Sequence, residues 1–199
     1  MKIRTIALIS GVLATTLALT GCSMEGMDME GMDMGGGSSP STSSSSGSSK
    51  ANNADIAFAM QMVAHHEQAV EMAQMILDKD GVDARVTELA QTIKDAQGPE
   101  IDTMNGWLTS WGTSGSMDGM DMGGTMSDAD MTALEAASGS EANKLFLAQM
   151  TVHHQGAIDM AKTELQDGQN ADALALAQKI VNDQTAEITR MKDLLGTLQ

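Results

Sequence analysis

A pair of adjacent histidines, His65 and His66, follows Met62 by three and four residues. Side chains at those spacings are neighbours on the surface of a helix. The surrounding residues form an apolar stripe of helical period that contains Met62, with the two imidazoles on either side of its centre and Met72 at its edge. A thioether beside two imidazoles suits copper, because soft sulfur prefers Cu(I) and imidazole accepts both oxidation states.

The same arrangement occurs a second time further along the chain. Residues 58–73 align with residues 146–161, and residues 89–104 align with residues 176–191. The counterparts of Met62, His65, His66 and Met72 are Met150, His153, His154 and Met160. The chain therefore contains an internal duplication, and both copies keep the methionine and histidine positions.

A glutamate falls on the apolar stripe of the helical segment that follows each histidine pair. The stripe positions are Gln97, Glu100 and Met104 in the first copy, and Gln184, Glu187 and Met191 in the second. A buried carboxylate is costly without a partner. Each glutamate is therefore either a metal ligand or a group that orients a histidine ring, and the sequence leaves both roles open.

The donor set disfavours several other metals. A Mg²⁺ or Ca²⁺ cage needs several carboxylates, and each half of the chain offers one on its inner face. A di-iron bundle site uses two Glu-x-x-His pairs, which this sequence lacks. Zinc could bind through histidine and glutamate, but it leaves the methionines unexplained. Met62 or Met72 taken singly could equally fill core space, so the copper hypothesis rests on the repeated pattern.

Two methionine-rich tracts lie where no core can form, and both mix methionine with aspartate and glycine. Their Met-x-Met and Met-x-x-Met spacings let several sulfur atoms bind one soft ion, so we expect weak, exchangeable Cu(I) capture. The alternative is a low-complexity spacer. The candidate capture residues are Met24, Met27, Met29, Met32, Met34, Met117, Met120 and Met122.

The overall composition excludes several classes of protein. The 199 residues carry 11 Lys and Arg against 27 Asp and Glu, a formal charge of −16, which argues against nucleic acid as a partner. The single cysteine excludes cysteine-rich zinc sites and iron–sulfur clusters. An aromatic share of 2% is too low for an aromatic-rich β-sandwich.

The first residues form a targeting segment, with Lys2 and Arg4 before an apolar run at 5–20. The run ends in Leu-Thr-Gly-Cys22, which resembles the signal box of bacterial lipoproteins. That resemblance implies cleavage before Cys22 and a lipid on its sulfur; an ordinary secretory signal is the alternative. We expect a signal peptide at 1–21 and a disordered tether, rich in methionine and serine, at 22–53.

The helical patterns predict an all-α protein. We expect helices at about 54–78, 83–110, 141–166 and 170–197, and a short helix at 128–137 that begins at Ser127. Gly98-Pro99 predicts a kink or a break in the second helix. Two hairpins, 54–111 and 141–198, would then form one four-helix bundle domain over 54–199, joined by the methionine-rich linker 112–127.

The pattern Met-x-x-His-His, then Ala-(Val/Ile)-(Glu/Asp)-Met-Ala, then Gln-x-x-Glu-Ile-x-x-Met resembles the bacterial "domain of unknown function 305" family over about residues 54–198. The resemblance implies a ferritin-like bundle in a secreted or envelope protein, with copper binding and tolerance in some members. Ala64 and Val152 stand where the family often has proline before the histidine pair. We expect a straighter helix there and no loss of ligands.

These observations predict a copper-binding protein anchored by lipid on the outer face of a membrane. It would sequester Cu(I), with Cu(II) also acceptable, or transfer it to an envelope partner. A metal oxidase, by analogy with ferritin-like oxidases, and a metal-free envelope binding module are the alternatives.

Overall fold

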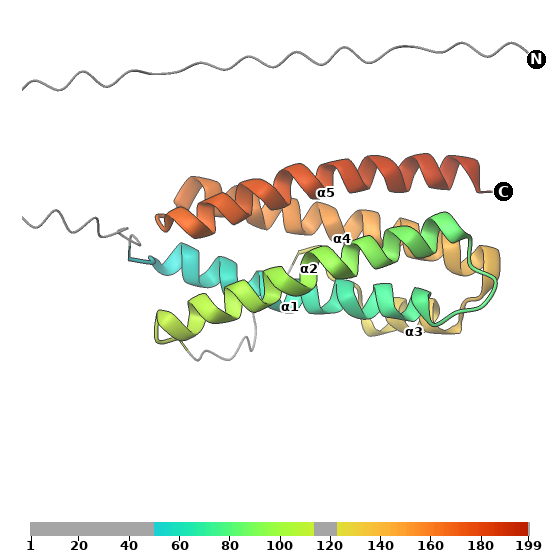
Figure 1. Ribbon diagram of the computed structural model, residues 1–199, viewed down its shortest axis with the longest axis horizontal. Helices are drawn as coiled ribbons and strands as arrows, with labels where there is room; N and C mark the ends of the chain where they lie inside the picture. The colour runs from blue at the N-terminus through green and yellow to red at the C-terminus, as the bar shows by residue number, and fades with distance from the viewer. Residues whose placement is uncertain (1–49, 114–122, 199) are drawn as a thin grey trace, which may run out of the picture. The chain divides into compact units, whose positions relative to one another are not determined.

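The computed structural model describes residues 50–113 and 123–198, which carry five helices and no strand (Figure 1). The helices are α1 (Asn53–Leu77), α2 (Ala84–Ser110), α3 (Asp128–Ala136), α4 (Gly139–Asp167) and α5 (Ala171–Thr197). The predicted all-α bundle is confirmed. None of these helices has the length and apolarity that a membrane span needs. The signal segment, Cys22 and all eight capture methionines lie outside the described residues.

Side-chain caps define where several helices begin. Asn52 and Asp55 form a reciprocal capping box at the start of α1, and Ser127 and Asp130 form another at the start of α3. Each box satisfies backbone N–H groups that have no acceptor within the helix. Asn170 caps α5, because its side-chain oxygen accepts hydrogen bonds from the backbone N–H groups of Asp172 and Ala173.

Helix α2 continues through Pro99, so the predicted break is wrong. Proline removes one backbone donor from the ladder, but the buried residues Leu89, Ile93 and Met104 hold α2 in the core on both sides of it. The hydroxyl of Thr103 also donates to the carbonyl oxygen of Pro99 at 2.8 Å. Packing on either side therefore keeps one helix where local sequence favours two.

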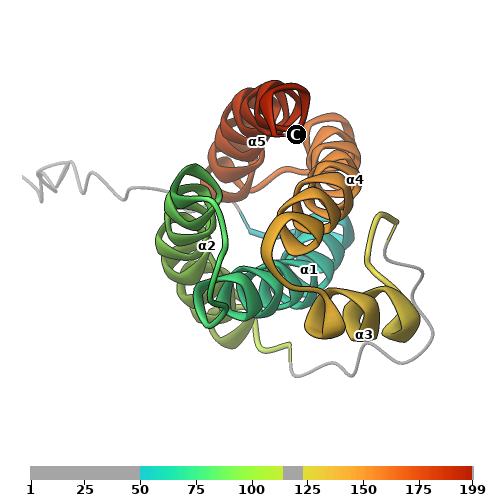
Figure 2. The ribbon, with the colours of Figure 1, turned by 90° about the vertical axis from the view of Figure 1, so that its right-hand side faces the viewer.

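The two hairpins face each other across α1 and α4. Helix α1 packs on α2, α4 packs on α5, and α1 also contacts α4. Figure 2 shows these four helices around a common centre, with α3 outside them against α1 and α4. The duplicated halves thus bring their equivalent first helices into contact.

Two apolar clusters fill the core, and the histidines lie between them. On α1, Met62 belongs to one cluster and Met72 to the other, with His65 and His66 between. Helix α4 crosses the same two clusters in the opposite direction. The bundle therefore has a layer of buried histidines with apolar packing above and below it.

The end of the interhelical linker is held on α4 by a glycine contact. A Cβ atom on Gly156 would lie 2.1 Å from the carbonyl oxygen of Gly123, and one on Gly124 would lie 2.7 Å from Cα of Gly156. Gly124 also has a positive φ of 87°, which favours glycine. Two hydrogen bonds between Gln68 and the backbone of Met126 attach the linker to α1.

We expect Gly156→Ala to destabilise the fold by about 1 to 3 kcal/mol, because the added methyl group must displace the linker backbone. Chemical unfolding measures the change. Gly106→Ala is the matched control, since no atom lies within 4 Å of its added Cβ and alanine favours the helix by about 0.5 to 1 kcal/mol. Equal effects of the two variants would contradict the contact between 123–124 and α4.

Candidate metal centre

The two equivalent histidines His65 and His153 meet at the centre of the bundle. Their ring centroids lie 3.7 Å apart, and the ring planes are tilted by 39°. The residues are 0% and 1% exposed. In the described part of the chain, none of their four ring nitrogens has a hydrogen-bond partner. Buried polar atoms without partners are rare and costly, so this pair needs an explanation beyond packing.

The other two histidines are each held by the glutamate of their own hairpin. His66 Nε2 lies 2.9 Å from Glu100 Oε2, and His154 Nε2 lies 2.7 Å from Glu187 Oε2. The Nδ1 atoms of both rings have no partner among the described residues. A carboxylate that binds one ring nitrogen fixes the orientation of the ring and leaves the other nitrogen for a metal.

The environment favours the neutral form of three of the rings, His65, His66 and His153. Burial, followed by the proximity of His66 and His154, lowers the pKa of His65 to about 3. Burial likewise brings the pKa of His153 well below its ordinary value. Burial also lowers the pKa of His66, although Glu100 opposes this shift. Neutral imidazole is the form that binds metals, so these three rings can coordinate without losing a proton.

The carboxyl group of Glu100 is ionised. Burial tends to raise its pKa, but hydrogen bonds from His66 and then Lys179 outweigh burial and lower the pKa below its ordinary value. Lys179 Nζ lies 2.9 Å from Glu100 Oε1. Glu100 therefore bridges a ring of its own hairpin and a lysine of the other hairpin.

Four fully buried methionines flank the histidine layer. Met62 and Met104 belong to one apolar cluster, and Met150 and Met191 belong to the other. We call Met62, His66, Glu100 and Met104 the first site, and Met150, His154, Glu187 and Met191 the second site. His65 and His153 lie between the two sites. Each hairpin thus contributes two thioethers and one oriented imidazole to its side of the layer.

The structure groups the remaining two candidate methionines differently from the sequence. Met72 lies in the cluster that contains Met150 and Met191, while Met160 packs against the cluster of Met62 and Met104. The reason is geometric, because each first helix crosses the histidine layer before it reaches these residues. Met72 is fully buried, whereas Met160 is half-buried and lines a groove.

No three His, Cys, Asp or Glu side chains converge on a metal-binding position within the residues that the structure describes. The donors that this layer offers are imidazole nitrogens and the thioether sulfurs of the flanking methionines. That donor set favours a soft ion over Mg²⁺, Ca²⁺ or a di-iron pair.

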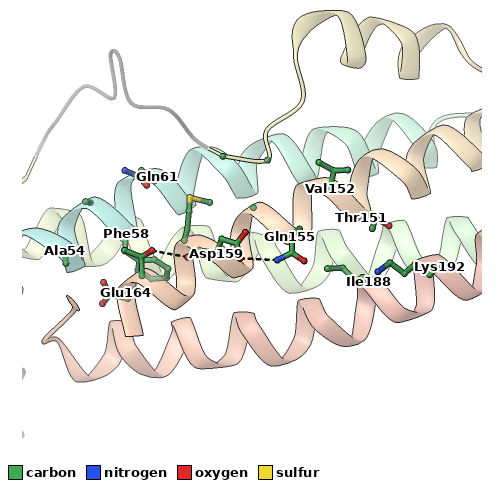
Figure 3. A pocket seen from close by; sticks show the side chains of 16 residues that line it. Ala54, Phe58, Gln61, Thr151, Val152, Gln155, Asp159, Glu164, Ile188 and Lys192 are labelled. Atoms are coloured by element: carbon green, nitrogen blue, oxygen red, sulfur yellow. Dashed lines mark hydrogen bonds between the residues drawn. The ribbon is translucent and has the colours of Figure 1, made fainter. Parts of the chain in front are cut away.

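The groove that Met160 lines runs along α4 and has a volume of about 750 Å³. Figure 3 shows Phe58 of α1 and Val152 of α4 on its walls, with Glu164 near one end and Lys192 near the other. Val152 is 55% exposed. The groove lies on the outer side of α4 and contains none of the four candidate histidines.

Two buried carboxyl groups were not anticipated as a pair from the sequence. Asp55 accepts hydrogen bonds from the backbone N–H groups of Asn52, Gln169 and Asn170 at 2.6, 2.9 and 2.8 Å. Burial and the adjacent Asp55 raise the pKa of Glu164 to about 8. Glu164 therefore carries the proton of this pair at neutral pH. The capping-box spacing of Asn52 and Asp55 could have pointed to Asp55, but no pattern distinguishes Glu164 from other helix-surface acids.

Glu164→Gln is expected to stabilise the fold at alkaline pH. The folded state holds the Glu164 proton up to a pKa of about 8, whereas 4.5 is its ordinary value. The contribution of this proton to stability is complete below pH 4.5 and is lost as the pH rises through 8. Glutamine stays neutral, so by pH 9 the variant should exceed the wild type by about 1 to 2 kcal/mol.

Urea unfolding at pH 5, 7 and 9 measures this difference. The exposed Glu71→Gln removes the same charge elsewhere on the bundle and serves as control. Parallel pH curves for wild type and Glu164→Gln would show that Glu164 ionises in the folded protein as it does in the unfolded chain.

The fold and site together define a class: a duplicated four-helix bundle with a buried histidine layer between methionines. The family model described as "Domain of unknown function (DUF305)" matches residues 55–195, and the chain belongs to this family. A comparison with curated proteins finds no match.

Several solved structures are similar to this chain. A DUF305 protein from Streptomyces coelicolor, described as secreted, is 36% identical, with a TM-score of 0.66 over 72% of this chain and 91% of that one. A DUF305 fragment from Deinococcus radiodurans is 29% identical, with a TM-score of 0.68 over 74% and 99%. CopM in its Cu(I)-bound form is 29% identical, with a TM-score of 0.61 over 72% and 96%. CopM is also solved with Cu(II) and with silver.

Proposed function

We propose that this protein binds copper through the first and second sites, with His65 and His153 between them as further ligands, in order to sequester the ion or transfer it. The observation that carries the proposal is the set of buried ring nitrogens without partners. Six of the eight nitrogens on the four histidines lack a hydrogen bond among the described residues. A bound ion would satisfy nitrogens that otherwise destabilise the folded protein.

The neighbouring thioethers favour copper over zinc. Met62, Met104, Met150 and Met191 lie fully buried in the clusters that border the histidine layer. Thioether sulfur prefers Cu(I), and imidazole accepts both Cu(I) and Cu(II). The similar structure of CopM in Cu(I)-bound and Cu(II)-bound forms supports the same ligand for this chain.

We further propose that the protein acts outside the cytoplasm, attached to a membrane by a lipid on Cys22. The lipoprotein-like signal box and the secreted relative from Streptomyces coelicolor support this location. The methionine tracts at 24–34 and 117–122 would capture Cu(I) and raise its local concentration beside the bundle. An envelope protein that accepts the ion would be the partner.

Titration of the purified full chain with Cu(I), against a competing chelator and under reducing conditions, tests the proposal. We expect tight binding by the wild type. A variant with all four histidines changed to asparagine should retain only the weak binding of the methionine tracts, a loss of about 100-fold or more. Circular dichroism checks that the variant is folded. Equal Cu(I) affinities of the two folded proteins would refute the proposal for the bundle.

A further inference from the structure

The two sites are built from aligned residues, but the charges around their glutamates differ. In the first site, Glu100 Oε2 contacts His66, and Glu100 Oε1 contacts Lys179 Nζ at 2.9 Å. Lys179 belongs to α5 of the other hairpin and also pairs with Asp183 at 2.7 Å. Both oxygens of Glu100 are thus engaged, and its negative charge has a cationic partner.

Within residues 50–113 and 123–198, the second site has no such cation. Glu187 contacts His154 through Oε2 and pairs with no lysine or arginine in the described ranges. Residues 91–93 align with residues 178–180, so the counterpart of Lys179 is Thr92. The Thr92 hydroxyl donates to the carbonyl oxygen of Glu88 at 2.8 Å within its own helix. A threonine in this position can supply neither the charge nor the reach of a lysine.

This difference changes what each glutamate can do. Glu100 is held at both oxygens, so it can position His66 but is not free to approach a metal ion. Glu187 is held at one oxygen and its side chain is 18% exposed. Its negative charge is not neutralised by a basic side chain, and it attracts a cation at the second site. Lys179 instead opposes a cation at the first site.

Resting on the proposed copper function, we infer that the two sites are not equivalent and that Lys179 is the residue that makes them differ. The second site binds Cu(II) more tightly, with Glu187 able to give its free oxygen to the ion. The first site is confined to sulfur and nitrogen ligands, and so favours Cu(I). The duplicated bundle therefore offers two sites of different selectivity.

Because Lys179 and Thr92 are aligned, giving each position the other's residue should change Cu(II) affinity in opposite directions at the two sites. In a His154→Asn variant, the first site is the one that keeps its oriented histidine. In this background, Lys179→Thr should raise the Cu(II) affinity about fivefold. In a His66→Asn variant, the second site is the one that keeps its oriented histidine. In this background, Thr92→Lys should lower the Cu(II) affinity about fivefold. Cu(I) affinities should change less than twofold, because Cu(I) carries half the charge and binds carboxylate weakly.

Lys162→Thr is the matched control for these exchanges. Lys162 and Lys179 are equally exposed, at 54%, and Lys162 pairs only weakly with Asp159 at 3.9 Å. The control removes one positive charge from the same bundle without touching either glutamate. It should change Cu(II) affinity less than twofold in both backgrounds. Isothermal titration against a competing chelator measures all of these affinities.

A metal-free measurement tests the same asymmetry. ¹⁵N NMR of the histidine rings in the wild type should show different Nε2 signals for His66 and His154, because Lys179 draws charge from Glu100 and leaves Glu187 unaffected. Lys179→Thr should make the His66 signal resemble that of His154, and Lys162→Thr should not.

The outcomes separate this inference from the proposed function. If neither single-site background binds copper above the four-histidine variant, both are refuted. If both backgrounds bind copper, but the exchanges change Cu(II) affinity no more than Lys162→Thr does, the asymmetry is refuted and the copper function stands. Equal Nε2 signals of the two rings in the wild type also overturn the asymmetry.

Discussion

Replacing both His65 and His153 by leucine is expected to make the metal-free protein more stable than the wild type, by about 2 kcal/mol. The two rings are buried against each other, and none of their ring nitrogens has a partner among the described residues. Leucine has a similar volume and no polar atom to desolvate, so it should fit between the two apolar clusters. The gain corresponds to a rise in melting temperature of roughly 4 to 8 °C for a chain of this size.

The same variant should lose the stabilisation that copper gives. A ligand that binds only the folded state adds about 2.7 kcal/mol at a concentration 100 times its Kd. We therefore expect copper to raise the melting temperature of the wild type and to change that of the double variant much less. Thermal unfolding with and without Cu(I), in the absence of oxygen, measures both effects.

Gln149→Leu is a control for the removal of a buried polar side chain. Gln149 Nε2 donates to the carbonyl oxygen of Asp130 at 3.0 Å, so leucine there breaks a hydrogen bond. This variant should lose stability and keep its response to copper. If the double histidine variant also lost stability without metal, the rings would belong to a metal-free polar network, and the copper proposal would lose its main support.

The histidine layer could be predicted from the sequence only in part. Helical period placed His65 and His66 on either side of one apolar stripe, and the duplication extended that prediction to the second copy. Period alone does not say which imidazole meets the other hairpin. That depends on how α1 crosses α4, and only the packing shows that the first histidine of each pair meets its counterpart.

The roles of Glu100 and Lys179 show the same limit. The sequence left Glu100 as either a ligand or an orienting group, and its 2.9 Å contact with His66 shows the orienting geometry. Lys179 is an exposed residue of α5, and its contact with Glu100 joins residues from different hairpins. No helical period predicts a contact of that kind. The break predicted at Gly98-Pro99 was wrong for the opposite reason, because packing on both sides of α2 overrode a local signal.

Replacing Met62, Met104, Met150 and Met191 together by leucine should separate sulfur as a ligand from sulfur as a core filler. Leucine and methionine are close in volume, so each exchange should cost less than about 1.5 kcal/mol of stability. All four methionines are fully buried in the clusters that border the histidine layer. We expect Cu(I) affinity to fall about 100-fold or more, because the ion loses its softest ligands.

Cu(II) binding should survive this change better, within about tenfold of the wild type, because imidazole and carboxylate are sufficient ligands for Cu(II). A matched variant exchanges four methionines outside the two sites for leucine, namely Met60, Met75, Met126 and Met131, which are all partly buried. It carries the same number of exchanges and leaves the methionine tracts intact, so its Cu(I) affinity should equal that of the wild type. Competition titrations with both ions on the two variants measure the difference.

A selective loss of Cu(I) in the first variant alone would assign the sulfur atoms a chemical role. An equal loss of both ions in that variant would point instead to a collapse of the histidine layer, which circular dichroism and the metal-free melting temperature would reveal. Unchanged Cu(I) binding would mean that imidazoles alone hold the ion. The buried methionines would then do no more than fill the space that leucine fills in other bundles, and the excess of thioethers beside the histidines would have no part in selecting a soft metal.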